Sequence, residues 1–255
     1  MKIKQTITAV VPARNEEKNI ARCITALKWC DKIVVLSMSN DQTAAISRNL
    51  GAKVIKMKNQ IKESFIAVQK NINFVIDHAA TDWILRIDAD EVVTPELKRE
   101  IISVINQRTN CVAYGIPRSQ YFLGGFLKGG DWAYDRLVRL FRPKYALYKP
   151  LVAVHEQFKV KGKICYLNNR LLHYSHPTVK DVIHKFQLYT DFEVLQIQET
   201  KLTAFFKTIY MPPYVFLRWT FWHLGIKDGV RGIVAGLFRA WYEFLLWKKF
   251  LKKIK

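Results

Sequence analysis

The sequence predicts an α/β fold, in which helices flank both faces of a sheet whose first strands run parallel. The first observation is that short β-rich runs alternate with helical segments through residues 6–87. The second is that polar residues follow the expected strands, at the edge where such sheets bind ligands. The third is composition: half of the 255 residues are hydrophobic and 13% are aromatic, which excludes a disordered chain.

Each element of the first half has its own local signal. The expected strands are 6–11, 32–36, 53–57 and 83–87, and the expected helices are 16–28, 43–50 and 65–79. Pro12 ends the first strand, and acidic residues in the first turn of 16–28 favour the helix dipole. Gly51 stands where a helix C-cap belongs, and Thr94 followed by Pro95 begins another helix. Strands separated by helices of this size are typical of βαβ units.

The pattern changes after Cys111. Further strands are expected at 111–117, 137–141, 152–160 and 164–167, and a glycine-rich loop spans residues 124–130. Helical signals dominate from Thr178 onward. Strand alternation places Arg136 and Arg142 on one face and Arg139 on the other, so not all three arginines can contact phosphate.

Four cysteines stand at positions 23, 30, 111 and 165. They are too few and too scattered for a disulfide scaffold, and no pair has the CxxC spacing of a zinc site. We therefore expect reduced thiols of a cytosolic protein. The N-terminal apolar stretch is too short for a signal peptide. We also expect no membrane-spanning helix, because Arg231, Arg239 and Glu243 interrupt the best candidate, residues 229–247.

The basic excess is concentrated at the C-terminus. The chain has a formal net charge of +20, and residues 201–255 hold eleven Lys and Arg, two acidic residues and four of the seven Trp. Cationic charge mixed with Trp, Phe and Leu is typical of a helix that lies in a membrane interface and is attracted to anionic lipids. A packed C-terminal helix with a solvated basic tail is the alternative. We expect no nucleic-acid partner, because no nucleic-acid-binding motif accompanies the charge.

An acidic cluster, Asp88-Ala89-Asp90-Glu91, follows the fourth expected strand. Carboxylates this close repel each other unless a cation is present. Mg²⁺ typically uses one or two carboxylates together with substrate phosphates. The cluster therefore predicts a site for a metal ion and a diphosphate, and the alternative is an acidic turn that caps a helix.

The chain resembles family-2 glycosyltransferases with the GT-A, or nucleotide-diphosphosugar transferase, fold over residues 5–200. The matching segments are residues 11–17 (VPARNEE), 39–43 (SNDQT) and 82–91 (DWILRIDADE). Residues 136–142 (RLVRLFR), 154–156 (VHE) and 172–175 (LHYS) resemble the branch related to the lipopolysaccharide-core glucosyltransferases. The combination is more specific than any one motif.

The resemblance implies a nucleotide-sugar donor, with a UDP-sugar expected, and Mg²⁺ or Mn²⁺ as the metal. The residues that it assigns to the base and ribose pocket are Pro12, Ala13, Asn15, Glu16 and Asp41. Asp88 would contact the ribose or the metal-bound phosphates, Asp90 would be the main metal ligand, and His173 would join it. Leu36 stands where the family usually has an Asp that contacts the base, and an apolar side chain cannot accept that hydrogen bond.

Enzymes that the chain resembles invert the anomeric centre by in-line displacement, which requires a general base for the acceptor hydroxyl. We assign this role to Glu156, with Asp135 and Asp131 beside the glycine-rich loop as rivals. The loop itself would let the acceptor approach the backbone closely, because glycine carries no side chain. Its alternative reading is an ordinary hairpin connection.

The sequence thus predicts an inverting, metal-dependent hexosyltransferase that acts on a lipid-linked or cell-envelope glycan. We expect a transferase domain at 1–200 and a membrane-associating helical extension at 201–255, which would hold the protein at the cytoplasmic face of the membrane. Two alternatives stay open. One is a non-catalytic membrane or polyanion binder, in which Leu36 marks lost donor affinity. The other is a nucleotidyltransferase, although residues 11–17 lack the glycine-rich phosphate loop of that class.

Overall fold

The computed structural model describes residues 4–57, 64–149 and 158–253. The chain forms two compact units. Unit 1 comprises Met1–Arg118 and Arg136–His173, and unit 2 comprises Ser119–Asp135 and Tyr174–Lys255. Each unit therefore combines segments that are distant in the sequence.

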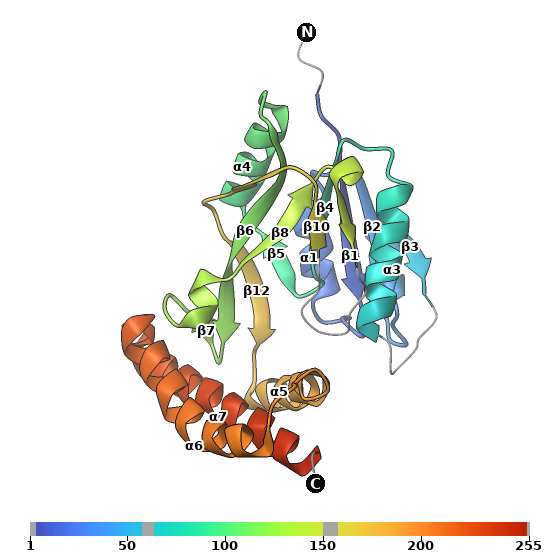
Figure 1. Ribbon diagram of the computed structural model, residues 1–255. Helices are drawn as coiled ribbons and strands as arrows, with labels where there is room; N and C mark the ends of the chain where they lie inside the picture. Colours follow the sequence, from blue (N-terminus) through green and yellow to red (C-terminus); the bar gives the residue numbers. More distant parts are fainter. Residues whose placement is uncertain (1–3, 58–63, 150–157, 254–255) are drawn as a thin grey trace. The chain divides into compact units, whose positions relative to one another are not determined.

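Four parallel strands form the first part of the sheet (Figure 1). They are β1 (Ile7–Ala13), β2 (Lys32–Ser37), β3 (Lys53–Lys56) and β4 (Trp83–Arg86), in the order β3-β2-β1-β4. In the register of β1, Pro12 lies opposite Leu36 of β2 and Val10 lies opposite Arg86 of β4. The carboxyl ends of these three strands therefore meet at one edge of the sheet, as predicted.

The sheet continues with strands of mixed direction. Beyond β4 the order is β8 (Arg136–Phe141), β6 (Cys111–Phe122), β12 (Leu171–His176) and β5 (Glu91–Val93). Two short strands, β7 (Gly125–Phe126) and β11 (Lys163–Tyr166), pair with β6, while β9 (Ala146–Tyr148) and β10 (Phe158–Val160) form a separate ribbon. β8 is antiparallel to β4 and β6, and β12 is antiparallel to β5. The sequence analysis did not include β5 or β12.

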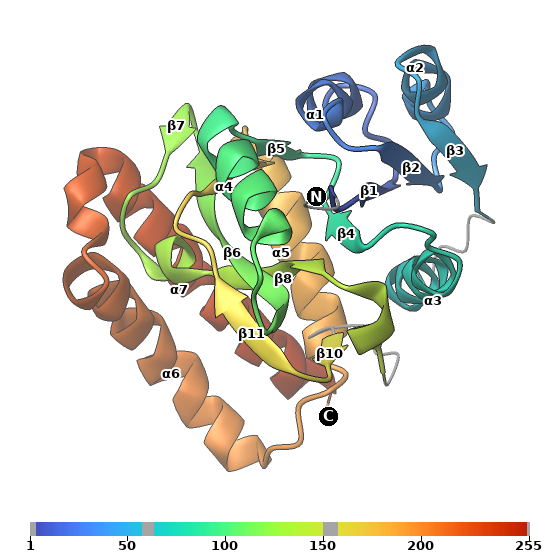
Figure 2. The same cartoon turned by 90° about the horizontal axis from the view of Figure 1, so that it is seen from above.

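Helices cover both faces of the parallel strands, as Figure 2 shows. α1 (Ile20–Leu27) and α2 (Thr43–Asn49) lie on one face, and α3 (Ser64–Asp77) lies on the other. The side chains of β1 alternate accordingly: Val11 belongs to the core that contains Ile24 of α1, and Val10 to the core that contains Ile72 of α3. α4 (Pro95–Asn106) contributes Leu97 to the first of these cores.

Two helix boundaries show how local signals act. α4 begins where the sequence predicts, because Thr94 Oγ1 accepts a hydrogen bond from Leu97 N at 3.1 Å and Pro95 fills the first turn. α1 begins at Ile20, later than the predicted start at Glu16. Asn15 has a φ of 53°, and the backbone N of Glu16 donates to Oγ1 of Thr43, the first residue of α2, at 2.8 Å, so residues 15 and 16 belong to the loop and not to the helix.

Unit 2 is built around α5 (Val179–Glu193), α6 (Lys201–Leu217) and α7 (Gly229–Lys253). α6 continues into a π-helical turn at Arg218–Trp222 and packs along α7. The indole of Trp219 is fully buried, and its Nε1 donates to the carbonyl of Gly232 at 2.8 Å. Gly232 permits the approach of the connection before α7, because a Cβ there would lie 1.8 Å from the carbonyl oxygen of Gly225. Within the described residues, we find no helix with the length and apolar character needed to cross a membrane.

The glycine-rich loop belongs to unit 2 and packs against this helical hairpin. Leu123 and Gly124 both have positive φ, 41° and 94°, and form the tight turn between β6 and β7. The backbone N atoms of Lys128 and Gly129 each donate to the carboxylate of Asp228 at 2.9 Å. A Cβ at Gly129 would lie 2.1 Å from the carbonyl oxygen of Leu224. The absence of a side chain at Gly129 therefore allows close packing of the loop against residue Leu224 of the same chain.

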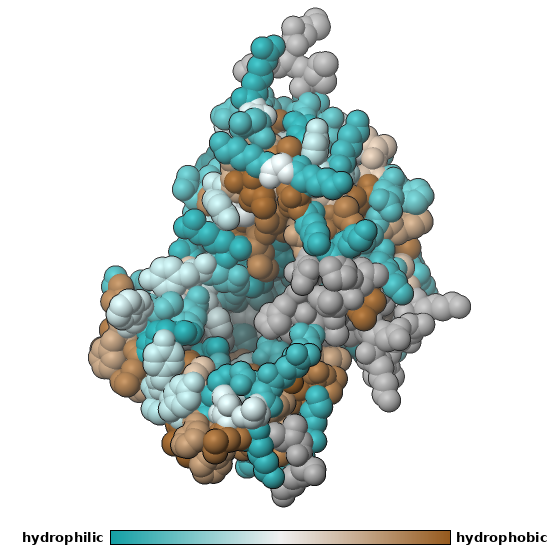
Figure 3. Space-filling model, viewed as in Figure 1, coloured by the Kyte–Doolittle hydropathy of each residue, from teal (hydrophilic) through white to brown (hydrophobic). Residues whose placement is uncertain are grey.

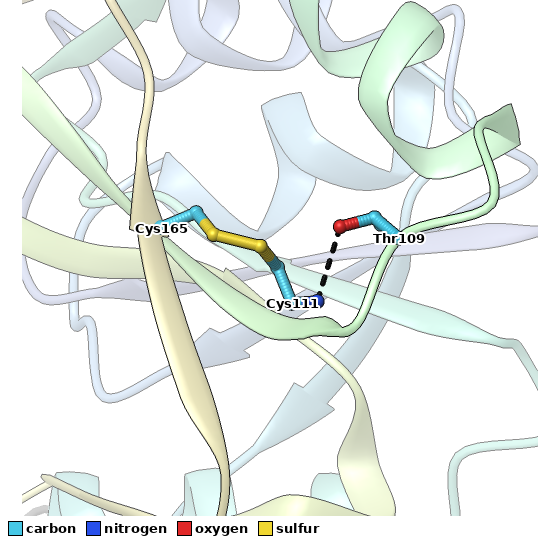
Figure 4. Close-up of a disulfide and its surroundings, with 3 residues drawn as sticks. All are labelled: Thr109, Cys111 and Cys165. Atoms are coloured by element: carbon cyan, nitrogen blue, oxygen red, sulfur yellow. Dashed lines mark hydrogen bonds between the residues drawn. A yellow bond between two sulfur atoms is a disulfide. The ribbon is translucent and has the colours of Figure 1, made fainter.

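The expectation of four reduced cysteines is wrong for two of them. Cys111 and Cys165 form a disulfide that joins β6 to β11 (Figure 4). The backbone N of Cys111 also donates to Thr109 Oγ1 at 3.1 Å. The two cysteines are 54 residues apart, and the parallel pairing of their strands brings the Cα atoms to 5.9 Å. The spacing of the cysteines in the sequence could not reveal this contact. Cys23 and Cys30 are free thiols, as expected.

Candidate active site

The candidate site lies in unit 1, where the loops after β1, β2 and β4 leave the same edge of the sheet. Asp41 ties the first two loops together. Its carboxylate accepts hydrogen bonds from Glu17 N at 3.1 Å and from the N and Oγ1 of Thr43 at 3.0 and 2.5 Å. Burial raises the pKa of Asp41, but these hydrogen bonds outweigh burial and lower the pKa below its usual value. The ionised carboxylate therefore fixes the shape of both loops.

The other residues predicted to line the base and ribose pocket lie beside this connection. Asn15 is exposed; its N donates to Ser39 Oγ at 2.9 Å, and its Oδ1 accepts from Asn40 N at 3.0 Å. Pro12 is half-buried and Ala13 is buried, both at the end of β1. The structure thus brings the predicted residues of the two loops together, and their role in nucleotide binding stays a prediction.

Leu36 has a structural role of its own. Its side chain is buried in the core that also contains Ile72 of α3. The position where the resemblance suggests an aspartate is therefore filled by a core residue.

The carboxylate of Asp88 is held by two guanidinium groups. Nη2 of Arg139 donates to one carboxylate oxygen, and Nη2 of Arg86 lies 3.5 Å from the other. Burial alone would raise the pKa of Asp88, but the charges of Arg139 and Arg86 outweigh it and hold the pKa well below its usual range. Burial likewise disfavours the charge on Arg139, yet Asp88 and Glu91 raise its pKa above the usual value. Both groups are therefore charged.

Glu91, at the start of β5, stabilises the C-terminal end of the acidic loop, residues 88–91. Its side chain is fully buried, and its Oε1 accepts from Nη2 of Arg139 at 2.9 Å and from Nη1 of Arg118 at 3.3 Å. Its Oε2 accepts from the backbone N of Asp88 at 2.8 Å. One side chain thus closes the loop and pairs with two arginines.

These contacts change the interpretation of the acidic cluster. The sequence analysis expected a metal ion to offset the repulsion among the carboxylates, whereas arginines offset it for Asp88 and Glu91. The sequence reasoning missed this network, although Arg86 and Arg139 carry a signal, since each is a charged residue directly preceded or followed by apolar residues of its strand. The predicted alternation holds here, because Arg139 is buried while Arg136 is exposed.

Asp90 lies next to His173. Its Oδ2 is 3.3 Å from His173 Nε2, and the two side chains are 13% and 14% exposed. The pairing of β5 with β12 produces this contact, because it places His173 opposite Glu91, the neighbour of Asp90. The two residues assigned to a metal by the resemblance are therefore neighbours, although they come from distant parts of the chain.

The pair has the composition and spacing of two metal ligands. Two neighbouring ligands of an octahedral ion, each about 2.1 Å from it, lie about 3 Å apart, close to the separation seen here. The Nδ1 of His173 is buried and has no hydrogen-bond partner among the described residues. No group of three or more His, Cys, Asp and Glu side chains suited to a metal is found in residues 4–57, 64–149 and 158–253. The role of Asp90 and His173 as metal ligands therefore stays a prediction.

The roles of the residues considered for the general base stay predictions. Glu156 lies outside the described residues. Asp135, the second candidate, is half-buried in unit 2 after a short 3₁₀ turn. Asp131, its neighbour, lies 2.5 Å from Nη2 of Arg218 and 3.1 Å from Nδ1 of His223, both in unit 2. The assignment of Glu156 as the general base, with Asp135 and Asp131 as rivals, is therefore unchanged.

Comparisons with known proteins agree with this picture. The family model described as "Glycosyl transferase family 2" matches residues 8–161. The lipopolysaccharide core biosynthesis glycosyltransferase LpsC of Rhizobium meliloti is 26% identical over 247 residues, which cover 95% of this chain and 90% of that protein. An uncharacterized glycosyltransferase of Rickettsia felis is 28% identical over 255 residues, covering 94% and 88% of the two chains.

A solved structure supports the fold. The mannosyltransferase PcManGT from Pyrobaculum calidifontis, in complex with GDP-Man and Mn²⁺, aligns with a TM-score of 0.54 and 10% identity. The alignment covers 98% of this chain and 87% of that chain. The likeness confirms the mixed sheet flanked by helices that the sequence predicts.

Proposed function

Because the chain belongs to glycosyl transferase family 2, we propose that it transfers a sugar from a nucleotide-diphosphate sugar to a hydroxyl of a lipid-linked or cell-envelope glycan. That it is a glycosyltransferase with the GT-A fold follows from the family match and the relatives. The acceptor class is suggested by LpsC, a relative named for lipopolysaccharide core biosynthesis. The donor class is suggested by PcManGT, which holds GDP-Man.

The observation that carries the proposal is the 3.3 Å contact between Asp90 and His173. We assign both side chains to a divalent ion, which when bound would neutralise charge on the leaving nucleoside diphosphate. An imidazole nitrogen beside a carboxylate oxygen suits Mn²⁺ better than Mg²⁺, because Mg²⁺ prefers an all-oxygen shell. PcManGT, whose structure contains Mn²⁺, is consistent with this choice.

The surrounding residues would position the donor. Arg139 and Glu91 hold the acidic loop in one shape, so Asp88 can meet the ribose or phosphates without rearranging. Pro12, Ala13, Asn15, Glu16 and Asp41 remain the residues that we assign to the base and ribose. The proposed general base, Glu156 or else Asp135, accepts the proton of the acceptor hydroxyl while the acceptor oxygen bonds to the anomeric carbon. The bond from that carbon to the diphosphate oxygen breaks on the opposite face, so the nucleoside diphosphate leaves and the centre is inverted.

We propose that the protein acts at a membrane surface. We assign residues 201–255 to a membrane-associating role at the inner face of the cytoplasmic membrane, because eleven Lys and Arg and four Trp gather there. A lipid-linked acceptor would be presented at such a surface.

A donor panel tests the proposed chemistry. Purified protein with Mn²⁺ is incubated with UDP-, GDP-, ADP- and CDP-sugars, and release of the nucleoside diphosphate is measured. We expect turnover of one nucleotide class, abolished by Asp90→Asn in a protein that still folds. Glu156→Gln should lower turnover more than donor affinity. Release that continues at the wild-type rate in Asp90→Asn would contradict the metal role, and no release from any donor would favour the non-catalytic alternative.

A further inference from the structure

The outer side of α6 is an unpartnered apolar face. Large side chains that are at least half exposed gather on it: Leu202, Phe205, Phe206, Ile209, Tyr210 and Tyr214. Their spacing of three and four residues places them on one side of the helix. Ala204 and Val215, on the opposite side, are buried, and Ala204 lies in a core with Leu246 of α7. We call the six exposed residues the α6 face.

The connection between α6 and α7 extends this surface. Trp222 is 83% exposed and Val230 is 78% exposed, and Phe221, Leu224 and Ile226 are exposed as well. We call these five residues the hairpin tip. Figure 3 shows hydrophobic side chains, in brown, among paler and teal ones over α6 and α7. Monomeric soluble proteins rarely leave so many adjacent aromatic and aliphatic side chains uncovered without a binding role.

The hairpin tip is held rigidly from inside. Trp219, one turn before Trp222, is fully buried and bonded to Gly232. Asp228, between Ile226 and Val230 of the tip, accepts hydrogen bonds from the glycine-rich loop. The exposed side chains therefore stand on a fixed frame, which reduces the entropy lost when they are ordered on binding.

The exposed charges of residues 201–253 have one sign. The acidic residues of 201–253 are Asp228 and Glu243, and both are engaged inside unit 2. Asp228 bonds to Lys128 and Gly129, while Glu243 is buried and lies 2.7 Å from Arg239. The outward charges of the same segment are cations: Lys201, Lys227, Arg231, Lys248, Lys252 and Lys253 are exposed.

We propose that the α6 face and the hairpin tip insert into the interface of an anionic bilayer, with the exposed cations meeting lipid headgroups. Aromatic side chains mixed with lysine are the composition that such an interface favours. A second copy of the chain fits less well, because the exposed charges of residues 201–253 are cations, and docking two of these surfaces would bring them together. The inference deepens the membrane part of the proposed function by naming the surface and its lipid.

Vesicle binding of the full-length protein tests the surface. Sedimentation is compared for vesicles of phosphatidylethanolamine with phosphatidylglycerol and for vesicles of phosphatidylcholine alone. The variant is Phe206→Glu, and the matched control is Phe74→Glu on α3, since the two phenylalanines are 55% and 52% exposed. We expect binding to the anionic vesicles only, weakened by salt. Phe206→Glu should bind at least about tenfold more weakly, or about 1.4 kcal/mol, while Phe74→Glu binds like the wild type.

A second variant, Trp222→Ala, covers the hairpin tip and should also weaken binding. Wild-type protein that ignores anionic vesicles, or Phe206→Glu and Trp222→Ala that both bind normally, would overturn the proposal. So would light scattering that shows a dimer dissociated by Phe206→Glu. Release of nucleoside diphosphate from a soluble donor separates the two proposals: turnover without vesicle binding removes the membrane surface alone, and vesicle binding without turnover counts against the transferase chemistry alone.

Discussion

The Nη2 atom of Arg139 lies 2.9 Å from Oε1 of Glu91, and both side chains are almost wholly buried. Replacing Arg139 by Met would leave the buried Glu91 carboxylate without its closest cation. Loss of one partner from a buried pair costs about 3–5 kcal/mol. We therefore expect Arg139→Met to lower the free energy of unfolding by that amount, measured by urea denaturation.

A control on the same strand separates this effect from loss of an arginine in general. Arg136 is exposed on β8, so Arg136→Met should leave the urea midpoint nearly unchanged. Arg139→Lys should fall between the two, because it keeps the charge but carries it one bond nearer the backbone than the Nη2 atom that contacts both Asp88 and Glu91. An Arg139→Met variant with the wild-type midpoint would show that the pair is not a determinant of stability.

The parts of the fold that follow from local signals can be predicted from the sequence. Thr94 and Pro95 begin α4 as expected, and the alternation of strands and helices over residues 6–87 matches β1 to β4 and α1 to α3. β5 has no such signal: it is three residues long and is held by its pairing with β12, which lies far along the chain.

The candidate site divides in the same way. Asp88 and Asp90 are visible in the sequence as a cluster after a strand, but their separate roles depend on distant partners. Arg139 forms an ion pair with Asp88, whereas His173 lies beside Asp90. Both partners come from strands that no local sequence pattern connects to the cluster. The assignment of His173 to a metal depends on the resemblance, because a lone histidine in a sequence is more often a structural residue.

The disulfide between Cys111 and Cys165 determines how many cysteines can react with a thiol reagent. Unfolded, unreduced protein should react with two equivalents of a thiol reagent, from Cys23 and Cys30, and with four after reduction. A cross-link closing 54 residues stabilises a fold by about 4 kcal/mol in the chain-entropy model. Reduction, or Cys111→Ser with Cys165→Ser, should lower the melting temperature accordingly. Four reactive thiols in protein purified without a reductant would contradict the pairing.

The pH dependence of the free energy of unfolding should show the contribution of the ionised Asp82 carboxylate. Its carboxylate accepts hydrogen bonds from the N and Oγ1 of Thr6, both at 2.8 Å, and the backbone bond from Thr6 is the main cause that lowers its pKa. A carboxyl whose folded pKa is depressed stabilises the fold above its unfolded pKa of about 3.9, and this stability is lost as the pH falls through the folded pKa.

Asp82→Asn should therefore be less stable than the wild type at pH 7, by a margin that shrinks as the pH falls below about 3.9. Urea unfolding at several pH values measures the margin. Asp77→Asn, at the exposed end of α3, controls for removal of a surface charge. A margin for Asp82→Asn that stays constant from pH 7 to pH 2 would show that ionisation of Asp82 does not contribute.

The most direct test of the account is Mn²⁺ binding to the purified protein in the presence of a nucleoside diphosphate, with free Mn²⁺ followed by electron paramagnetic resonance. We expect one bound ion in the wild type and affinity reduced at least about tenfold, or about 1.4 kcal/mol, in both Asp90→Asn and His173→Ala. Asp77→Asn at the end of α3 and His78→Ala directly after it, both at exposed positions, should bind like the wild type. Unchanged Mn²⁺ affinity in both Asp90→Asn and His173→Ala would contradict the central claim.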